Sequence, residues 1–122
     1  MVDEPRKIGD DDELYRRVAP EWVTDGAINS AAYSTNDPDG ISVDLARLTT
    51  PEETRARALG AANGVGVVAV RIPRGQGLEV RPDPQPDNPA HCLIMSQTGI
   101  LTRAQRRALA EHTRLLISPD PR

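Results

Sequence analysis

The sequence predicts a single α+β domain in which helices cover one face of a small mixed or antiparallel sheet. Short runs of β-branched and other apolar residues predict the strands, and two segments with capping signals predict helices. These elements do not alternate regularly, as a sheet of βαβ units would require. Because 122 residues suit one domain, we expect a flexible N-terminal tail over residues 1–12, the folded domain over 13–118 and a C-terminal tail over 119–122.

The first third of the chain contains one short apolar run and a long stretch of turn-forming residues. Residues 14–18 predict a strand that Pro20 closes, although a helix there also fits the sequence. Residues 22–40 are rich in Gly, Pro, Asn and Asp, and a short strand over 27–33 would fit inside this stretch. We therefore expect one strand followed by an irregular region.

The signals for the first helix lie between residues 50 and 60. Thr50 can cap the N-terminus, Pro51 suits the first helical position, and Glu53 completes a capping box. Gly60 supplies a C-terminal stop, so the segment predicts a helix of about two to three turns.

Strands are expected again in the second half of the chain. Residues 65–72 are nearly all apolar and rich in valine, which predicts a buried central strand. A turn at 73–75 separates this strand from a shorter one over 77–81, and another strand spans 90–95. We expect any functional site on the face of the sheet that the helices leave uncovered.

The last predicted element is a helix that starts at Arg103. Thr102 is its expected N-cap, and Gln105 stands at the capping-box position. One apolar face of this helix carries Leu101, Ala104, Ala108, Leu109, His112, Leu115 and Leu116. His112 is expected at the rim of that face with a satisfied hydrogen bond.

Composition excludes several classes of protein. The net charge is −3 with acids and bases interspersed, so we expect no nucleic-acid partner, which usually requires a clustered basic surface. Of the 15 basic residues only Lys7 is a lysine, which a GC-rich bacterial genome would explain. Cys92 is the only cysteine, which rules out an intramolecular disulfide and favours a cytoplasmic location. No run of about 18 apolar residues occurs, so we expect a soluble protein without a membrane partner.

The segment 81–92 is the most distinctive part of the sequence because it contains four prolines. Each proline fixes its φ angle and restricts the preceding residue, so this Pro-rich loop loses little entropy when it is ordered. It can hold a defined set of polar side chains, which are Asp83, Asp87, Asn88 and His91. Such rigidity suits a binding site, but it also suits a plain connector.

His91 has the widest chemistry of this set, since an imidazole serves as acid, base or ligand near neutral pH. The alternative is that His91 only hydrogen-bonds loop carbonyl groups or Asp87. The loop acids, His91 and Cys92 match no recognised zinc spacing, and we expect no metal. Consecutive strand residues point to opposite faces, so Cys92 is expected in the core rather than beside His91 as a nucleophile.

Arg16 lies in the first predicted strand, on the side that alternation turns toward the core. A guanidinium there needs an anion, which is either an internal partner such as Asp44 or Glu79 or a bound ligand. Ser30, Tyr33 and Ser34 could supply hydroxyl groups beside the Arg16 guanidinium. The alternative is that these residues only cap turns.

Five short blocks follow one another along the chain: LYRRV at 14–18, NSAAY at 29–33, SVD at 42–44, GLEV at 77–80 and DNPAH at 87–91. Their order resembles a family of small uncharacterised bacterial proteins, and this resemblance implies no activity.

A Tyr-Arg pair, Tyr15 and Arg16, together with Ser30 further on, gives a fainter similarity to ADP-ribosyltransferase-like domains. In that family the pair on the first strand grips NAD and a serine begins the second core strand, while aromatic side chains contact the nicotinamide. Here the available aromatic residues are Tyr15, Trp22 and Tyr33. His91 stands where the family has an acid on a later strand, and no Glu-x-Glu occurs there.

From these features we expect a small cytoplasmic bacterial interaction or accessory domain that presents the Pro-rich loop to a protein partner. Its expected binding residues are Asp83, Asp87, Asn88, His91, Tyr15 and Tyr33. The first alternative is a NAD- or nucleotide-using transferase with Arg16, Ser30 and His91 as catalytic residues. The second alternative is a subunit of a larger assembly without a site of its own, and a homo-oligomer is also compatible with the sequence.

Overall fold

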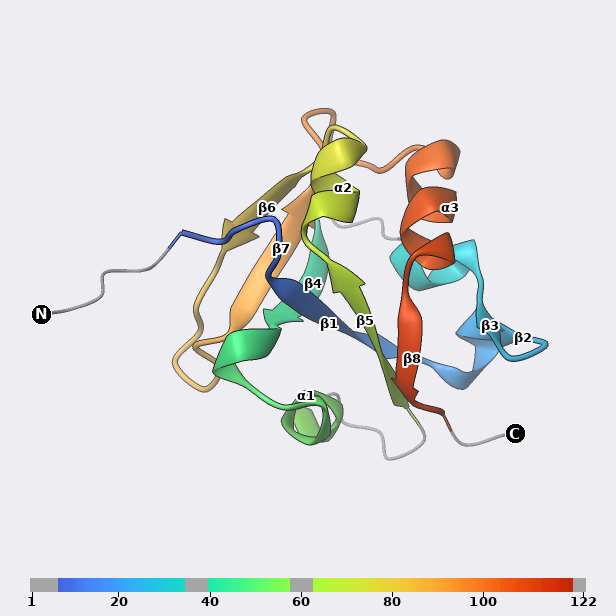
Figure 1. Cartoon of the computed structure of the whole chain (residues 1–122), viewed down its shortest axis with the longest axis horizontal. Helices are drawn as coiled ribbons and strands as arrows, with labels where there is room; N and C mark the ends of the chain where they lie inside the picture. The colour runs from blue at the N-terminus through green and yellow to red at the C-terminus, as the bar shows by residue number, and fades with distance from the viewer. Residues whose placement is uncertain (1–6, 35–39, 58–62, 120–122) are drawn as a thin grey trace, which may run out of the picture.

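The computed structural model describes residues 7–34, 40–57 and 63–119, and Figure 1 shows their arrangement. A six-stranded antiparallel sheet in the order β6-β7-β4-β1-β5-β8 forms the centre of the molecule. Its strands are β1 Glu13–Val18, β4 Ile41–Leu45, β5 Gly64–Ala69, β6 Glu79–Pro82, β7 His91–Met95 and β8 Arg114–Ile117. A small two-stranded sheet consists of β2 Val23–Thr24 and β3 Ala27–Ile28. The expected α+β fold with one domain is confirmed.

Short helices connect these strands. They are α1 Pro51–Arg57, α2 Arg71–Gly75 and α3 Arg103–Glu111, with the 3₁₀-helices η1 Pro20–Trp22, η2 Ser30–Tyr33 and η3 Ala46–Leu48. α3 packs on η2 and α2, and side chains of α3 and η2 join the core cluster on one face of the sheet. α1 contacts β1 and β5, and its Thr54 donates a hydrogen bond to Asp44. The Asp44 side chain projects from the other face of the sheet, which is polar.

Alternation along the strands separates the core face from the polar face. Leu14 and Val18 of β1 are buried with Val43 and Leu45 of β4 in one apolar cluster. Phenylalanine is absent from the chain, so this core consists mainly of small aliphatic side chains, with Tyr33 as its largest fully buried residue. Each fully buried aliphatic side chain contributes about 1.5–3 kcal/mol to the hydrophobic stabilisation of the fold.

The capping signals in the sequence locate the start of both predicted helices correctly. The hydroxyl oxygen of Thr50 accepts a hydrogen bond from the Glu53 amide at 3.1 Å, at the start of α1. At α3 the complete capping box is present, because Thr102 and Gln105 each accept a hydrogen bond from the other's amide. The predicted end of α1 at Gly60 lies outside the described residues.

Two strand predictions were too long. The strand predicted over 65–72 stops earlier, and α2 replaces its end and the predicted turn, because Pro73 cannot donate to a strand ladder. Only the first part of the strand predicted over 27–33 forms. The rest is the helix η2, which begins because the Asn29 side chain accepts a hydrogen bond from the Ala31 amide.

The prediction that the last helix continues to Leu116 was wrong. α3 ends at Glu111, and the two leucines that follow belong to β8. β8 pairs with the edge of β5 and places Leu115 opposite Gly66, where an added side chain would collide with Thr113. The missing side chain of Gly66 thus makes room for the turn into a new strand, and the helical spacing of the leucines could not reveal this.

Part of the expected N-terminal tail belongs to the fold. Ile8 is buried in the core, and its carbonyl oxygen accepts a hydrogen bond from Arg74 of α2 at 2.7 Å. Asp10 forms an ion pair with the same arginine. Folded structure therefore begins before residue 13, while residues 1–6 and 120–122 lie outside the described residues.

Candidate functional site

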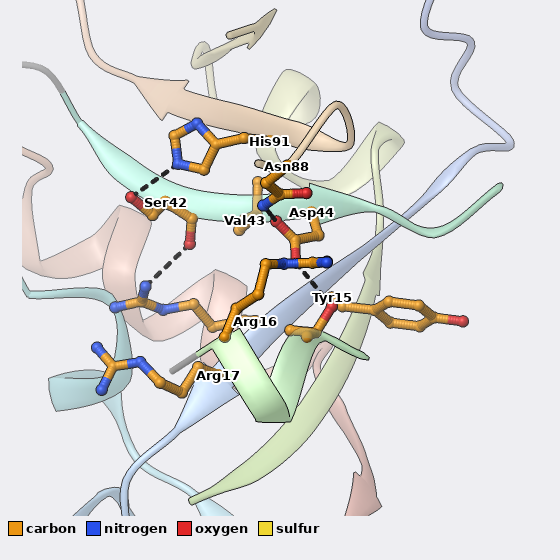
Figure 2. Close-up of a pocket in the computed structure, with 10 residues that line it drawn as sticks. Tyr15, Arg16, Arg17, Ser42, Val43, Asp44, Asn88 and His91 are labelled. Carbon is orange, nitrogen blue, oxygen red and sulfur yellow. Dashed lines mark hydrogen bonds and ion pairs between the residues drawn. The ribbon is translucent and has the colours of Figure 1, made fainter. Parts of the chain in front are cut away.

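A hollow of about 240 Å³ opens on the polar face of the sheet (Figure 2). Strand register explains which side chains line it. Tyr15 of β1 lies opposite Asp44 of β4, which lies opposite His91 of β7, so three neighbouring strands place these side chains in one row. Ser42 follows this row on β4, and α1 closes one side.

Arg16 enters the hollow because β1 and β4 separate beside it. These strands are paired only from Leu14↔Leu45 to Tyr15↔Asp44, whereas β1 pairs with β5 along its whole length. Where pairing with β4 ends, the Arg16 guanidinium bridges the gap and donates to the Ser42 carbonyl oxygen at 2.9 Å. Its Nε donates to the Ala32 carbonyl oxygen of η2, also at 2.9 Å.

Arg16 is only 7% exposed, and carbonyl groups and aromatic rings surround its guanidinium. It lies 5.2 Å from the ring centroid of Trp22 and 5.8 Å from that of Tyr33. Burial, and to a smaller degree the charge of Arg17, lowers the pKa of Arg16 to about 10, so it remains a cation at neutral pH. Among the described residues Arg16 has no carboxylate partner, so neither Asp44 nor Glu79 forms the internal ion pair that the sequence offered as one alternative.

The two carboxylates expected to neutralise Arg16 have other partners. Asp44 pairs with Arg57 of α1 at 2.8 Å, and Glu79 pairs with Arg81 at the edge of the sheet. The backbone carbonyl groups thus provide the only acceptors for Arg16 among the described residues. Carbonyl dipoles compensate a buried cation less completely than a carboxylate does.

Asp44 is the second buried charge at the site, with 6% exposure. Its carboxylate accepts hydrogen bonds from the Thr54 hydroxyl at 2.7 Å and from Arg57 and Asn88 at 2.8 Å each. Burial alone would raise the pKa of Asp44, but these hydrogen bonds and the charge of Arg57 outweigh burial and lower the pKa below its usual value. The anion therefore ties α1 and the Pro-rich loop to β4.

The Pro-rich loop is a tight hairpin between β6 and β7. Gln85 and Asn88 exchange two backbone hydrogen bonds of 3.0 Å each. The side-chain oxygen of Asn88 also accepts from the Ala90 amide, which leaves the side-chain amide directed at Asp44. Asp87 lies exposed at the tip of the hairpin. The loop thus turns one polar side chain inward and leaves the other outside.

His91 contacts polar groups on both sides of its ring. Nδ1 lies 3.0 Å from the carboxylate of Asp83 and 3.1 Å from the carbonyl oxygen of the same residue. Nε2 lies 3.2 Å from the hydroxyl oxygen of Ser42, as Figure 2 shows. His91 thus does hydrogen-bond a loop carbonyl, as one alternative proposed, but its acidic partner is Asp83 rather than Asp87.

The described lining of the hollow is positively charged although the chain as a whole is negative. Three arginines, Arg16, Arg17 and Arg57, face one described carboxylate, that of Asp44, while the net charge of the chain is −3. Arg17 lies 5.6 Å from the ring centroid of Trp22, so the guanidinium groups of both neighbouring arginines contact the same indole. An anion entering the hollow would meet an excess of cationic donors.

The structure brings together some of the predicted residues and separates others. Four predicted residues line the hollow, namely Tyr15, Arg16, Asn88 and His91, and Asp83 contacts His91 from the loop. Three others do not line it, namely Ser30, Tyr33 and Asp87. Tyr33 is fully buried and hydrogen-bonded to Thr113 on the core side. Sequence reasoning missed four polar lining residues, because only the strand register and the position of α1 reveal them; they are Arg17, Ser42, Thr54 and Arg57.

The remaining candidates have structural roles. Cys92 points into the core opposite to His91, as expected, and burial raises the pKa of its thiol to about 11. His112 ends α3, and its Nδ1 lies 2.9 Å from the Ala108 carbonyl oxygen, which fits the satisfied rim position. Within the described ranges, no three His, Cys, Asp or Glu side chains are grouped so as to hold a metal ion.

A second hollow of about 290 Å³ lies between the Pro-rich loop and η3. Its walls are largely apolar and include Pro82, Pro84, Pro89 and Leu48. Leu48, which lines this hollow, is 51% exposed.

Comparisons with protein-family models, with curated proteins and with solved structures found no match for this chain. None of the helices in the described part of the chain is long and apolar enough to cross a membrane. The inference of function therefore rests on the geometry of the two hollows.

Proposed function

We propose that this domain binds a small anionic ligand, through a phosphate or carboxylate group, in the hollow lined by Arg16, Arg17 and Arg57. The observation that carries the proposal is the excess of positive charge among the described residues of this hollow, including a buried guanidinium that has no carboxylate partner in residues 7–34, 40–57 and 63–119. Guanidinium groups bind carboxylate and phosphate oxygens in a planar, bidentate way. A bound anion would supply a counter-charge that the described residues do not give to Arg16.

The size of the hollow restricts the ligand. About 240 Å³ is less than drug-sized ligands usually occupy, so we expect the hollow to take the anionic end of a molecule rather than a complete dinucleotide. NAD and nucleotides remain in the proposal as phosphate-bearing ligands. The specific ADP-ribosyltransferase proposal also needs Ser30 near the ligand, and Ser30 does not line the hollow.

Trp22 offers a direct assay, because it is the only tryptophan of the chain and contacts the guanidinium groups of Arg16 and Arg17. We would titrate inorganic phosphate, ADP and NAD while recording tryptophan fluorescence, and measure thermal unfolding with each ligand. A ligand present at about 100 times its Kd should add about 2.7 kcal/mol to the free energy of unfolding. Added salt should weaken binding, because the contact is electrostatic.

Arg17→Ala is the informative variant, because the Arg17 side chain has no hydrogen bond to another described residue and its loss should not disturb the fold. Replacing Arg16 would remove hydrogen bonds to Ala32 and Ser42, and replacing Arg57 would remove the ion pair with Asp44. We expect the substitution to weaken anion binding at least 10-fold, which corresponds to about 1.4 kcal/mol. Arg81→Ala removes an exposed arginine outside the hollow and serves as the matched control. Equal binding by the two variants, or no saturable signal with any of the three ligands, would refute the proposal.

A second candidate function is the binding of a protein partner in the second hollow, beside the Pro-rich loop. The apolar hollow beside Leu48 favours it, because the exposed leucine and three rigid prolines form a concave apolar surface with a low ordering cost. The occupant would be a segment of a partner protein that inserts an apolar side chain next to Leu48. Asp87 at the loop tip would stand at the rim of this contact.

The protein-partner proposal is tested by Leu48→Asp, which places a charge in the apolar hollow. We expect wild-type protein to retain a partner in crosslinking experiments that Leu48→Asp fails to retain, while both proteins unfold at similar temperatures. Ile100→Asp, at another exposed apolar residue away from the loop, is the control. A partner that both variants retain equally would exclude this surface.

A further inference from the structure

The hydrogen-bonded chain Ser42–His91–Asp83 has the connectivity of a nucleophile, a general base and an orienting carboxylate. We infer that it is a catalytic triad for the hydrolysis of small carboxylic esters that carry an additional anionic group. The anionic group would bind the arginines, so this inference rests on the proposed anion binding. Such triads are defined by geometry and roles rather than by fold or by order along the chain.

The tautomer of His91 follows from its partners. Both groups that face Nδ1, the carboxylate and the carbonyl oxygen of Asp83, can only accept hydrogen bonds. Nδ1 must therefore carry the proton, and in the neutral ring Nε2 is the unprotonated nitrogen. The Ser42 hydroxyl donates to this nitrogen across 3.2 Å, which is the direction required to remove its proton.

Each member of the triad is held by separate contacts. The backbone amide of Asp83 donates to the His91 carbonyl oxygen at 2.9 Å, which fixes the acid beside the imidazole. Ser42 is the second residue of β4, and Arg16 donates to its carbonyl oxygen at 2.9 Å. Its side chain is exposed and lines the hollow together with His91. A substrate can thus approach the hydroxyl oxygen while the backbone stays fixed.

The reaction balances with water as the co-reactant. Ser42 Oγ attacks the ester carbonyl carbon, its proton passes to His91 Nε2, and the C–O bond to the alcohol breaks as the alcohol takes that proton. Water then attacks the acyl-serine and gives a proton to Nε2, the bond to Oγ breaks, and the proton returns to Ser42. One ester and one water yield one acid and one alcohol.

The test combines covalent labelling with turnover. A fluorophosphonate probe should phosphonylate Ser42, because Oγ displaces fluoride from phosphorus, and mass spectrometry would locate the adduct. After subtraction of the uncatalysed rate, which the internal carboxylate raises, kcat/KM should be higher for the 4-nitrophenyl monoester of succinic acid than for 4-nitrophenyl butyrate, which has no carboxylate. We expect Ser42→Ala to abolish labelling and to lower kcat by about 100-fold or more. Ser96→Ala, a serine outside the hollow, should change neither measurement.

Asp83 acts through His91 as a positioning residue. Because its side chain is 40% exposed, we expect Asp83→Asn to lower kcat less than Ser42→Ala does and to leave KM unchanged. A purely structural role would instead lower the temperature of unfolding without separating kcat from KM.

The outcomes separate this inference from the proposed anion binding. If Ser42 is not labelled, or if wild type and Ser42→Ala hydrolyse the succinate ester equally, the triad is overturned. Phosphate titration of Ser42→Ala then shows whether anion binding stands on its own. Labelled Ser42 without a preference for the anionic ester would instead overturn the assigned substrate class.

Discussion

Asp44→Asn removes the buried charge of Asp44 and keeps the size and shape of its side chain. It is therefore the sharpest test of whether this charge stabilises the site. The wild-type carboxylate accepts three side-chain hydrogen bonds, one of them from a cation. An asparagine side chain has one acceptor oxygen and turns an NH₂ group toward the remaining donors. A charge-assisted hydrogen bond contributes about 1.5–3 kcal/mol, and a neutral one about 1 kcal/mol. Arg57 is partly exposed, at 29%, so water replaces some of the lost interaction.

These contributions predict that Asp44→Asn lowers the free energy of unfolding by about 2–3 kcal/mol at pH 7. For a chain of this size the loss corresponds to about 8–12 °C in Tm. Urea unfolding followed by Trp22 fluorescence would measure it as a lower midpoint at constant slope. Glu79→Gln removes an exposed carboxylate that also pairs with an arginine, and as the control it should change stability by less than about 0.5 kcal/mol.

The pH dependence provides the refuting result. The folded-state pKa of Asp44 is lowered, so its contribution is complete above the unfolded-state pKa of about 3.9 and is lost as the pH falls through the folded-state value. The difference between wild type and Asp44→Asn should be constant from pH 7 to about pH 5 and shrink below about pH 4, where protonated aspartic acid resembles asparagine. A difference that does not shrink at low pH would show that the charge of Asp44 is not what stabilises the fold.

Three further predictions concern the scaffold. The Cys92 thiol should react with 5,5′-dithiobis(2-nitrobenzoate) at least about 100-fold more slowly in native protein at pH 8 than in urea. The reason is that Cys92 is 2% exposed and the pKa of its thiol is raised to about 11. Comparable rates would contradict its buried position. Gly64→Ala should destabilise the protein by about 1–3 kcal/mol in urea unfolding, since an added Cβ would collide with the Ile117 carbonyl oxygen of β8, whereas Gly75→Ala, with open space around it, should not. Thr102→Ala should lower stability by about 1 kcal/mol through loss of the capping box at α3, and an unchanged unfolding midpoint would contradict that role.

Local signals predicted those parts of the fold that depend on neighbouring residues in sequence. Thr102 and Gln105 interact across three positions, and their pattern is visible without any tertiary contact. By contrast, the end of α3 and the start of β8 depend on a free edge of β5 and on the missing side chain of Gly66. Tertiary pairing there outweighed the helical spacing of Leu115 and Leu116.

The residues of the candidate site also fall into those that local patterns predicted and those that only tertiary structure reveals. Strand alternation predicted that Arg16 is buried, but not that β1 and β4 separate and let carbonyl groups satisfy it. The stiffness of the Pro-rich loop drew attention to His91, whereas Ser42 lies in an ordinary strand and carries no local signal. Only the register between β4 and β7 brings the Ser42 hydroxyl to the imidazole. Residues that form a site from different strands are therefore beyond the reach of local patterns.

Stability and site geometry are coupled through Asp44 and Asn88. The carboxylate of Asp44 holds the side-chain amide of Asn88, and the backbone of Asn88 closes the hairpin and accepts from the His91 amide at 3.2 Å. Loosening the hairpin would move Asp83 and His91 relative to Ser42, although Asp44 contacts none of the three by a hydrogen bond. A displacement of about 1 Å is enough to impair such a site. We therefore expect Asp44→Asn to slow fluorophosphonate labelling of Ser42 even at temperatures where the variant is fully folded. Unchanged labelling would show that the prolines alone keep the loop in place.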